Sequence, residues 1–287
     1  MSIYIFTEIT ADYPKDCPGK DLTILPMTVS IGDDSYDNIT TFISPKEFYE
    51  RMQAGALTNT AMVQPYMAKE AFEEKLKEGY DVLYVGFSSA LSGTYAGCAR
   101  VIAELAGEYP DRKIAAVDSL NASAGEGLLL WYTVQKRDEG ASFEELVEYV
   151  KNLVPQTVAL FTVDDLRHLA RLGRCSKASA MIGTAMQIKP VLHVDDEGRL
   201  MPYTKVISRK KALKALVDGM EERMLPKEDQ KKVFIGHGAC YEDALLVKKL
   251  IEDRLDVHTV EICDIGPVIG AHTNAGVVAL FFLGKNK

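Results

Sequence analysis

Short apolar runs alternate with helical patterns through the first half of the chain. The runs with the length and β-branched content of buried strands are residues 2–7, 22–31, 81–87 and 113–119. Two of the helical stretches begin with a Ser-x-x-Glu capping box, at Ser44 with Glu47 and at Ser142 with Glu145. This β-α alternation predicts a doubly wound, mostly parallel sheet.

The pattern becomes mixed after residue 156. Residues 157–163 are strand-like, and residues 189–207 predict two strands joined by an Asp-Glu-Gly turn, which is a hairpin signal. The remaining elements expected here are a short helix ending at Gly173, helices at residues 209–224 and 242–255, and strands at 232–238, 258–265 and 276–284. We therefore predict an N-terminal doubly wound α/β domain of residues 1–155 and a C-terminal mixed α/β domain of residues 156–287.

Composition and charge narrow the class of protein. The 287 residues carry a formal net charge of −8, which argues against nonspecific binding to nucleic acid. No apolar run reaches the length of a membrane span, and the N-terminal residues show no secretory signal. The five cysteines are scattered without CxxC spacing, so a zinc ribbon or redox motif is not supported. We expect a cytoplasmic protein with free thiols and no cofactor.

The segment FSSALSGTYAG, residues 87–97, places five hydroxyl side chains between an apolar strand and a helix. Because ligands bind at the carboxyl ends of parallel strands, we expect these side chains to lie at one sheet edge with two other polar strand ends. Those strand ends are Thr7-Glu8 and Asp118-Ser119. Ser92 is also placed to cap the following helix, and both roles are compatible because a helix N-terminus binds anions.

A second candidate segment is IGPVIGAHTNAG, residues 265–276, in which glycines surround His272 and Thr273. Glycines allow a backbone to approach a ligand closely. The histidine is either a ligand contact or a hydrogen-bonded structural residue. No other histidine lies at metal-ligand spacing, so we expect no metal site.

With these segments taken together, the sequence resembles the DegV family of bacterial fatty-acid-binding proteins. SSALSGTY is similar to the family's SSxLSGTY signature, and DSLNASAGEG to its DS…S.G.G segment. LARLGRCSKASAMIGTAMQIKPVL resembles the L..GGR…LG..L.IKPIL block, and IGPVIGAHTNAG the IGP.IG.HTG.G loop. The resemblance covers nearly the whole chain.

The resemblance implies two α/β domains that hold one long-chain fatty acid between them in an apolar tunnel. Carried over by motif position, the residues that bind the carboxylate are Thr60, Ser92, His272 and Thr273. The family also implies that the protein is not itself an enzyme. It presents the carboxylate to a separate ATP-dependent fatty acid kinase, and the acyl phosphate is used in phospholipid synthesis. Arg174 matches the GGR arginine, which is associated with the phosphate or the kinase.

Several positions depart from the family pattern. The opening TDS motif is Thr7-Glu8-Ile9, the TS pair is Thr60-Ala61, and Asn274 replaces the glycine of HTG. Ile207 stands where many relatives carry an arginine, a role that Arg209 is placed to take over. Arg209 forms either a basic rim for a phosphate or a kinase, or a solvated run of charges, together with Lys210, Lys211, Arg171 and Arg174.

Three other functions compete with this interpretation. The Ile207 departure leaves open a lipid carrier or sensor that has no kinase partner. A serine hydrolase using Ser92, His272 and Asp118 would lack the G-x-S-x-G nucleophile elbow. ATP binding by the chain itself would lack a P-loop. Residues 181–188 and 277–284 are apolar enough to line a tunnel, although such residues are more often ordinary core.

Overall fold

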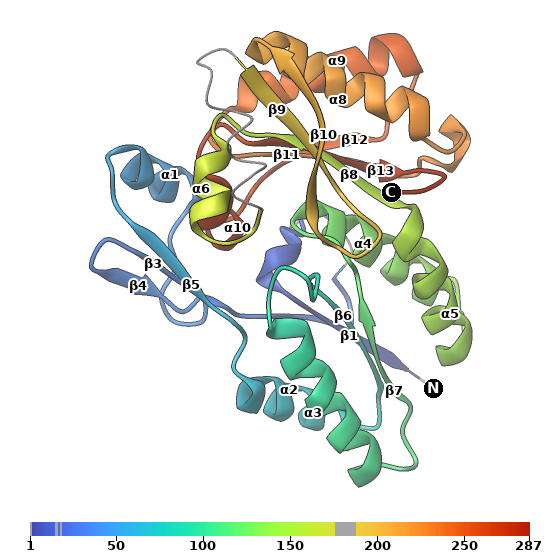
Figure 1. Cartoon of the computed structure of the whole chain (residues 1–287). Coiled ribbons are helices and arrows are strands. Elements are labelled where there is room, and N and C mark those ends of the chain that lie inside the picture. The colour runs from blue at the N-terminus through green and yellow to red at the C-terminus, as the bar shows by residue number, and fades with distance from the viewer. Residues whose placement is uncertain (1, 15–16, 18, 176–187) are drawn as a thin grey trace.

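The chain folds into alternating layers of helices and sheets, which Figure 1 shows edge-on. The computed structural model describes residues 2–14, 17, 19–175 and 188–287. From the bottom of Figure 1 upward, the layers are α2 with α3, a parallel sheet, α4 with α5, a mixed sheet, and α8 with α9. The bounds of these helices are Pro65–Lys77 (α2), Thr94–Glu108 (α3), Ala124–Asp138 (α4), Phe143–Leu153 (α5), Arg209–Arg223 (α8) and Tyr241–Leu255 (α9).

The parallel sheet has the strand order β2-β1-β6-β7. Its strands are Leu22–Leu25 (β2), Ile3–Glu8 (β1), Asp81–Gly86 (β6) and Ile114–Asp118 (β7). Because β1, β6 and β7 are parallel neighbours, the carboxyl ends of the three predicted strands do meet at one edge. There the Oε1 atom of Glu8 accepts the backbone N–H of Phe87 at 3.0 Å.

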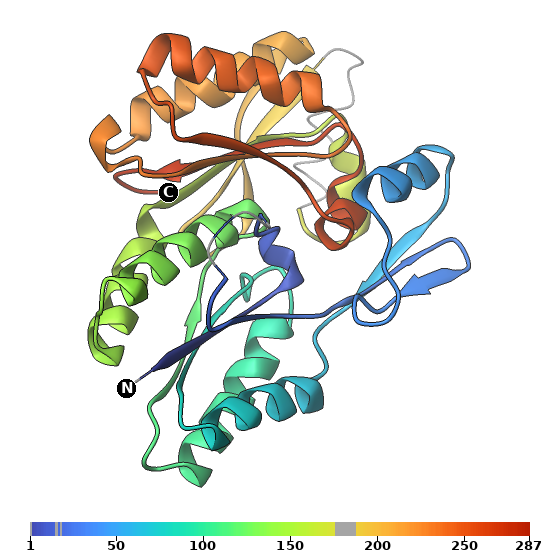
Figure 2. The same cartoon turned by 180° about the vertical axis from the view of Figure 1, so that it is seen from behind.

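The predicted strand at residues 22–31 is wrong in one respect, because it is two strands in two different sheets. Pro26 has no backbone N–H to donate to a ladder, and the chain leaves the parallel sheet there. After it, β3 joins a small antiparallel sheet of order β4-β3-β5, which Figure 2 shows projecting to one side with α1. The bounds are Thr28–Ile31 (β3), Asp34–Tyr36 (β4), Thr58–Ala61 (β5) and Pro45–Gln53 (α1).

The mixed sheet contains the strands of the second half in the order β10-β9-β8-β13-β11-β12. Their bounds are Leu200–Ile207 (β10), Ile188–Val194 (β9), Thr157–Thr162 (β8), Val278–Leu283 (β13), Val233–His237 (β11) and Val260–Asp264 (β12). The predicted hairpin is present, since β9 and β10 pair antiparallel. The remaining elements are α6 (Leu166–Arg171), α10 (Pro267–Thr273) and the 3-10 turns η1 (Ile9–Ala11), η2 (Val154–Gln156) and η3 (Lys227–Asp229).

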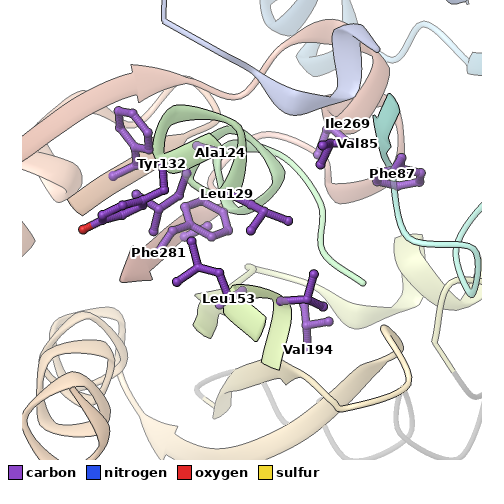
Figure 3. Packing of buried hydrophobic residues seen from close by; sticks show 14 of the residues in the cluster. Val85, Phe87, Ala124, Leu129, Tyr132, Leu153, Val194, Ile269 and Phe281 are labelled. Atoms are coloured by element: carbon purple, nitrogen blue, oxygen red, sulfur yellow. The ribbon is translucent and has the colours of Figure 1, made fainter. Parts of the chain in front are cut away.

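Helix α4 is buried between the two large sheets. All of its residues from Ala124 to Leu130 are buried, and its side chains join one apolar cluster that includes both sheets. Figure 3 shows members of this cluster from both halves of the chain, among them Leu129 and Phe281. A Cβ atom on Gly127 would lie 2.5 Å from the carbonyl oxygen of Ala11. The turn η1 approaches α4 this closely only because glycine occupies that position.

Strands β8 and β13 divide their side chains between two cores. Leu280 and Phe282 point into the cluster beneath α8 and α9, whereas Ala279 and Phe281 belong to the cluster around α4. This two-sided burial explains why residues 277–284 read as a continuous apolar run. On the α4 side, Ala159 and Ala279 are small, and both line the candidate site.

Candidate functional site

A largely apolar cavity lies between the two large sheets, beside the start of α4 and the face of α10. It holds about 770 Å³ of atom-free space, including its opening to solvent. Its apolar wall is formed by Met27, Phe87, Leu91, Ala122, Ala159, Phe161, Leu169, Val194, Leu200, Ile265, Val268, Ile269, Val277, Ala279 and Phe281.

Of the tunnel-lining segments considered from sequence, residues 277–284 contribute Val277, Ala279 and Phe281 to this wall at alternate positions. Residues 181–187 of the other segment lie outside the described part of the chain. The described helices include none that is both long and apolar enough to cross a membrane.

The five residues matched to the carboxylate and GGR motifs all line this cavity. They are Thr60 on β5, Ser92 before α3, Arg174 after α6, and His272 and Thr273 at the end of α10. Elements that lie far apart in the chain therefore bring these side chains to one cavity. Their role in binding a carboxylate remains a prediction.

His272 is the central polar group of the cavity. Its Nε2 atom lies 2.9 Å from the Thr60 hydroxyl oxygen. Its Nδ1 atom is buried and has no hydrogen-bond partner among the described residues. Burial, together with the nearby Arg174 and His168, lowers the pKa of His272 to about 4. The imidazole is therefore neutral near pH 7, and it has one nitrogen left to bond a ligand.

The hydroxyl groups near His272 are held by local bonds. The Ser92 side chain lines the cavity, and its Oγ atom accepts the Thr94 backbone N–H at 3.2 Å and lies 3.0 Å from the Thr94 hydroxyl. The N-cap residue of α3 is Gly93, so the expectation that Ser92 caps this helix is wrong by one residue. The Thr273 hydroxyl donates to the carbonyl of Ile269 at 3.3 Å. A hydroxyl donates one bond and accepts two, so Ser92 can donate to a ligand when the Thr94 hydroxyl donates to it, whereas Thr273 can donate to a ligand only by releasing the Ile269 carbonyl.

Arg174 is fixed in place without a counter-charge. Its Nε and Nη1 atoms donate to the backbone carbonyls of Leu91 and Leu172, at 3.2 and 2.5 Å. Within the described part of the chain, no acidic side chain lies within ion-pair distance of it. A guanidinium positioned by two carbonyls at a cavity wall is suited to hold an anion.

Arg209 does not line the cavity. Its Nε atom donates to Asp243 at 2.8 Å, and its Nη1 atom lies 3.9 Å from Asp164. Its charge is therefore already paired, which weakens the expectation that it replaces the arginine missing at Ile207. Contact of Arg209 with a phosphate or a kinase remains a prediction.

The arrangement does not assemble a serine hydrolase relay among the described residues. Asp118 accepts the backbone N–H groups of Ser89 and Leu120, and not a bond from His272. The ring of His272 is bonded to Thr60, and its other nitrogen has no orienting acid. Nor do three or more His, Cys, Asp or Glu side chains gather in a metal-binding arrangement anywhere in the described ranges.

Sequence reasoning assigned no cavity role to Thr10 or Ser123, nor to the buried acid Glu126 behind them. Thr10 and Ser123 line the wall near the start of α4. The Thr10 hydroxyl donates to the fully buried Glu126 at 3.1 Å, and Glu8 is buried beside it. Burial raises the pKa of both glutamates, with a further contribution from repulsion by Asp118 at Glu8 and by Glu8 at Glu126. The TADY segment that follows β1 carries no motif by which Thr10 was recognisable.

The comparisons with known proteins agree with this architecture. The family model described as an uncharacterised protein of the DegV family matches residues 2–285. The chain belongs to the DegV family. A DegV domain-containing protein of Clostridium perfringens is 41% identical over 286 residues, covering 99% of this chain and 98% of the relative.

Two solved DegV-family structures show the same fold. A fatty acid binding DegV protein of Streptococcus agalactiae has a TM-score of 0.87 at 28% identity, and the match covers 100% of both chains. A DegV protein of Thermus thermophilus, described by its fatty acid binding, has a TM-score of 0.86 at 26% identity and matches 99% of this chain and 100% of its own. The predicted family and mixed α/β fold class are thereby confirmed.

Proposed function

We propose that this chain binds one long-chain fatty acid, with the alkyl tail along the apolar wall and the carboxylate at Thr60, Ser92, His272 and Thr273. The observation that carries the proposal is an apolar cavity in which hydroxyls and a neutral imidazole stand beside an arginine that has no counter-charge among the described residues. The fatty acid binding described for the Streptococcus agalactiae and Thermus thermophilus relatives supports it.

The two ends of such a ligand contribute differently to its affinity. Burying about fourteen methylenes at roughly 0.8 kcal/mol each is worth on the order of 11 kcal/mol before the costs of association. A charge-assisted hydrogen bond contributes about 1.5–3 kcal/mol before the carboxylate is desolvated. The tail therefore sets most of the affinity, and the polar cluster sets the orientation.

Two measurements test the binding proposal. Mass spectrometry of an organic extract of the purified protein should detect a long-chain fatty acid at about one per chain, and the emptied protein should take up labelled palmitate or oleate. Ser92→Ala should weaken palmitate binding roughly tenfold, while Ser89→Ala, which changes an exposed hydroxyl outside the cavity, should not. A protein that carries no lipid and takes none up would end the proposal.

We further propose that the bound carboxylate is presented to a separate ATP-dependent fatty acid kinase in the cytoplasm. A carboxylate oxygen would attack the γ-phosphorus of ATP, forming the acyl phosphate as the bond to ADP breaks. Neutral hydroxyls suit this step because they hold the carboxylate without neutralising it, and Arg174 has a charge free for the incoming phosphate. The acyl phosphate would then enter phospholipid synthesis.

Reconstitution with a purified bacterial fatty acid kinase separates this role from that of a carrier or sensor without a kinase. ATP-dependent acyl phosphate formation should require the loaded protein and should fall in Arg174→Ala. Lys210→Glu tests the basic rim, with Lys249→Glu on α9 as the matched exposed control. If the loaded protein supports no phosphorylation, the carrier alternative stands, and the paired Arg209 and exposed Ile207 account for the lost partnership.

A further inference from the structure

Asp12, the residue after η1, joins three segments that are far apart in the sequence. Its backbone is left-handed, with φ 44°, a conformation that aspartate tolerates better than most residues with a Cβ. Its Oδ2 atom accepts the Ser123 hydroxyl at 2.5 Å, and its Oδ1 atom accepts the Gly266 backbone N–H at 2.9 Å. One carboxyl group thus ties the end of η1 to the starts of α4 and α10.

Both partners of Asp12 have backbones that depend on this junction. Ser123 adopts φ 53° and ψ −146°, well outside the regions where serine usually lies. A Cβ atom on Gly266 would lie 2.6 Å from the Asp12 Oδ1 atom, so any other residue there would displace the carboxyl. Three backbone constraints that meet at one carboxyl group indicate a specific junction, because strain of this kind persists only where its surroundings demand it.

The junction controls the helix that carries His272. Helix α10 is seven residues long, and Gly266 gives it no side-chain cap of its own. Asp12 instead accepts the backbone N–H of Gly266 itself and so holds, from another part of the chain, the residue at which α10 begins. At 1.5 Å per residue, His272 lies only about 8 Å along the axis from the first residue of α10. A shift at the start of this short helix would therefore move His272 and change its 2.9 Å contact with Thr60.

We propose that Asp12 is a positioning residue for the carboxylate end of the cavity, fixing α10 so that His272 meets Thr60 and the ligand head group. Asp12 does not line the cavity and touches no ligand. The inference rests on the proposed binding of a fatty acid. Helix α10 also contributes Val268 and Ile269 to the apolar wall, but the part of that wall on β8 and β13 does not depend on α10, so the inference concerns the head group more than the tail.

The positioning does not require a negative charge on Asp12. Burial raises the pKa of Asp12 to about 7. A protonated carboxyl keeps both bonds if Oδ2 donates to the Ser123 oxygen while Oδ1 accepts from Gly266. An asparagine side chain offers the same donor and acceptor, so it should preserve the junction, whereas alanine removes both bonds.

The test compares palmitate with its methyl ester, which has the same tail but no carboxylate. Dissociation constants for both ligands are measured with the full chain and with Asp12→Ala and Asp12→Asn. We expect Asp12→Ala to lower the preference for the acid about tenfold with little change for the ester, and Asp12→Asn to stay within about threefold. Asp256→Ala, at a left-handed aspartate (φ 54°) after α9, is the matched control.

A spectroscopic measurement reports the same effect without a ligand. The ¹⁵N signals of the His272 ring should move in Asp12→Ala and not in Asp12→Asn. Variants are expected to fold, because Tyr49 and His168 also bond the backbone of the α10 segment, at 2.9 and 2.8 Å. If Asp12→Ala does not fold, Gly266→Ala displaces the carboxyl and is measured instead.

The outcomes separate this inference from the binding proposal. If the wild-type chain binds neither palmitate nor its methyl ester, the proposed function itself is wrong. Equal losses for acid and ester in Asp12→Ala, no loss, or failure of Asp12→Asn to retain the acid preference would each overturn the positioning role while fatty acid binding stands.

Discussion

Replacing Ala159 with leucine tests whether the space between the sheets holds an acyl chain. Ala159 is 1% exposed, lines the cavity and pairs with Phe281 across β8 and β13. Phe281 lies four residues beyond Val277, or about 13 Å along the strand. Val277 is close in sequence to Thr273, so Ala159 marks the end of the cavity that is remote from the polar cluster.

The expected magnitude follows from the three carbon atoms that Ala159→Leu adds. They occupy the space of about three methylenes of the tail, worth roughly 2.4 kcal/mol, so palmitate should bind about 60-fold more weakly. The same carbons fill vacant space in the empty protein and should raise its free energy of unfolding by up to about 2 kcal/mol. In a close-packed core they would instead cost about 1–3 kcal/mol.

Calorimetric titration with palmitate and decanoate, combined with thermal unfolding of the lipid-free protein, measures both effects. Decanoate should keep its affinity, because its shorter tail ends before Ala159. Ala215→Leu, at a partly buried position of α8 outside the cavity, is the matched control. Unchanged palmitate binding together with lower stability would refute the placement of the tail.

Three further experiments probe the surroundings of the cavity. Gly127→Ala should destabilise the fold by about 1–3 kcal/mol in chemical denaturation, because its Cβ would lie 2.5 Å from the Ala11 carbonyl. Burial raises the pKa of Glu8 to about 7, so its contribution to stability is full below about pH 4.5 and is lost as the pH rises towards this folded-state pKa. Glu8→Gln should therefore make the free energy of unfolding depend less on pH between pH 5 and 8. Thr60→Val and His272→Ala should show a coupling of about 1 kcal/mol in a double-mutant cycle of palmitate affinity, and additive losses would exclude a working hydrogen bond.

Local signals in the sequence predicted most elements of the fold. The Ser142 capping box is present in full, and the Ser44 side chain accepts the Glu47 backbone N–H as expected. The signals failed where a tertiary choice decided the outcome. Residues 22–31 are apolar throughout, so only Pro26 hinted that they belong to two sheets. The glycines around His272 are typical of a loop, but this segment contains helix α10. Gly266 followed by Pro267 is a helix-start signal that indicates the helix.

The candidate site was less accessible to direct reasoning. The hydroxyl segment with Ser92 was recognisable from its residues, but Thr60 was found only through the family resemblance, because its strand β5 is short and polar. Asp12 carries no sequence signal, and Ser123 stands out only as a serine of the motif DSLNASAGEG, since the importance of both comes from backbone conformations and contacts across more than a hundred residues. Arg209 shows the converse, because its cationic sequence context gave no indication of its pairing with Asp243.

Helix α4 bears on the predicted division of the chain at residues 155 and 156. The helix lies before that boundary, yet it contacts strands from both halves of the chain. All of its first seven residues are buried. Cutting the chain at η2 would expose α4 in the first fragment and the apolar face of the mixed sheet in the second. We expect neither fragment to be soluble alone, and we expect co-expressed fragments to reassociate. The cavity would therefore form only in the complex of the two fragments.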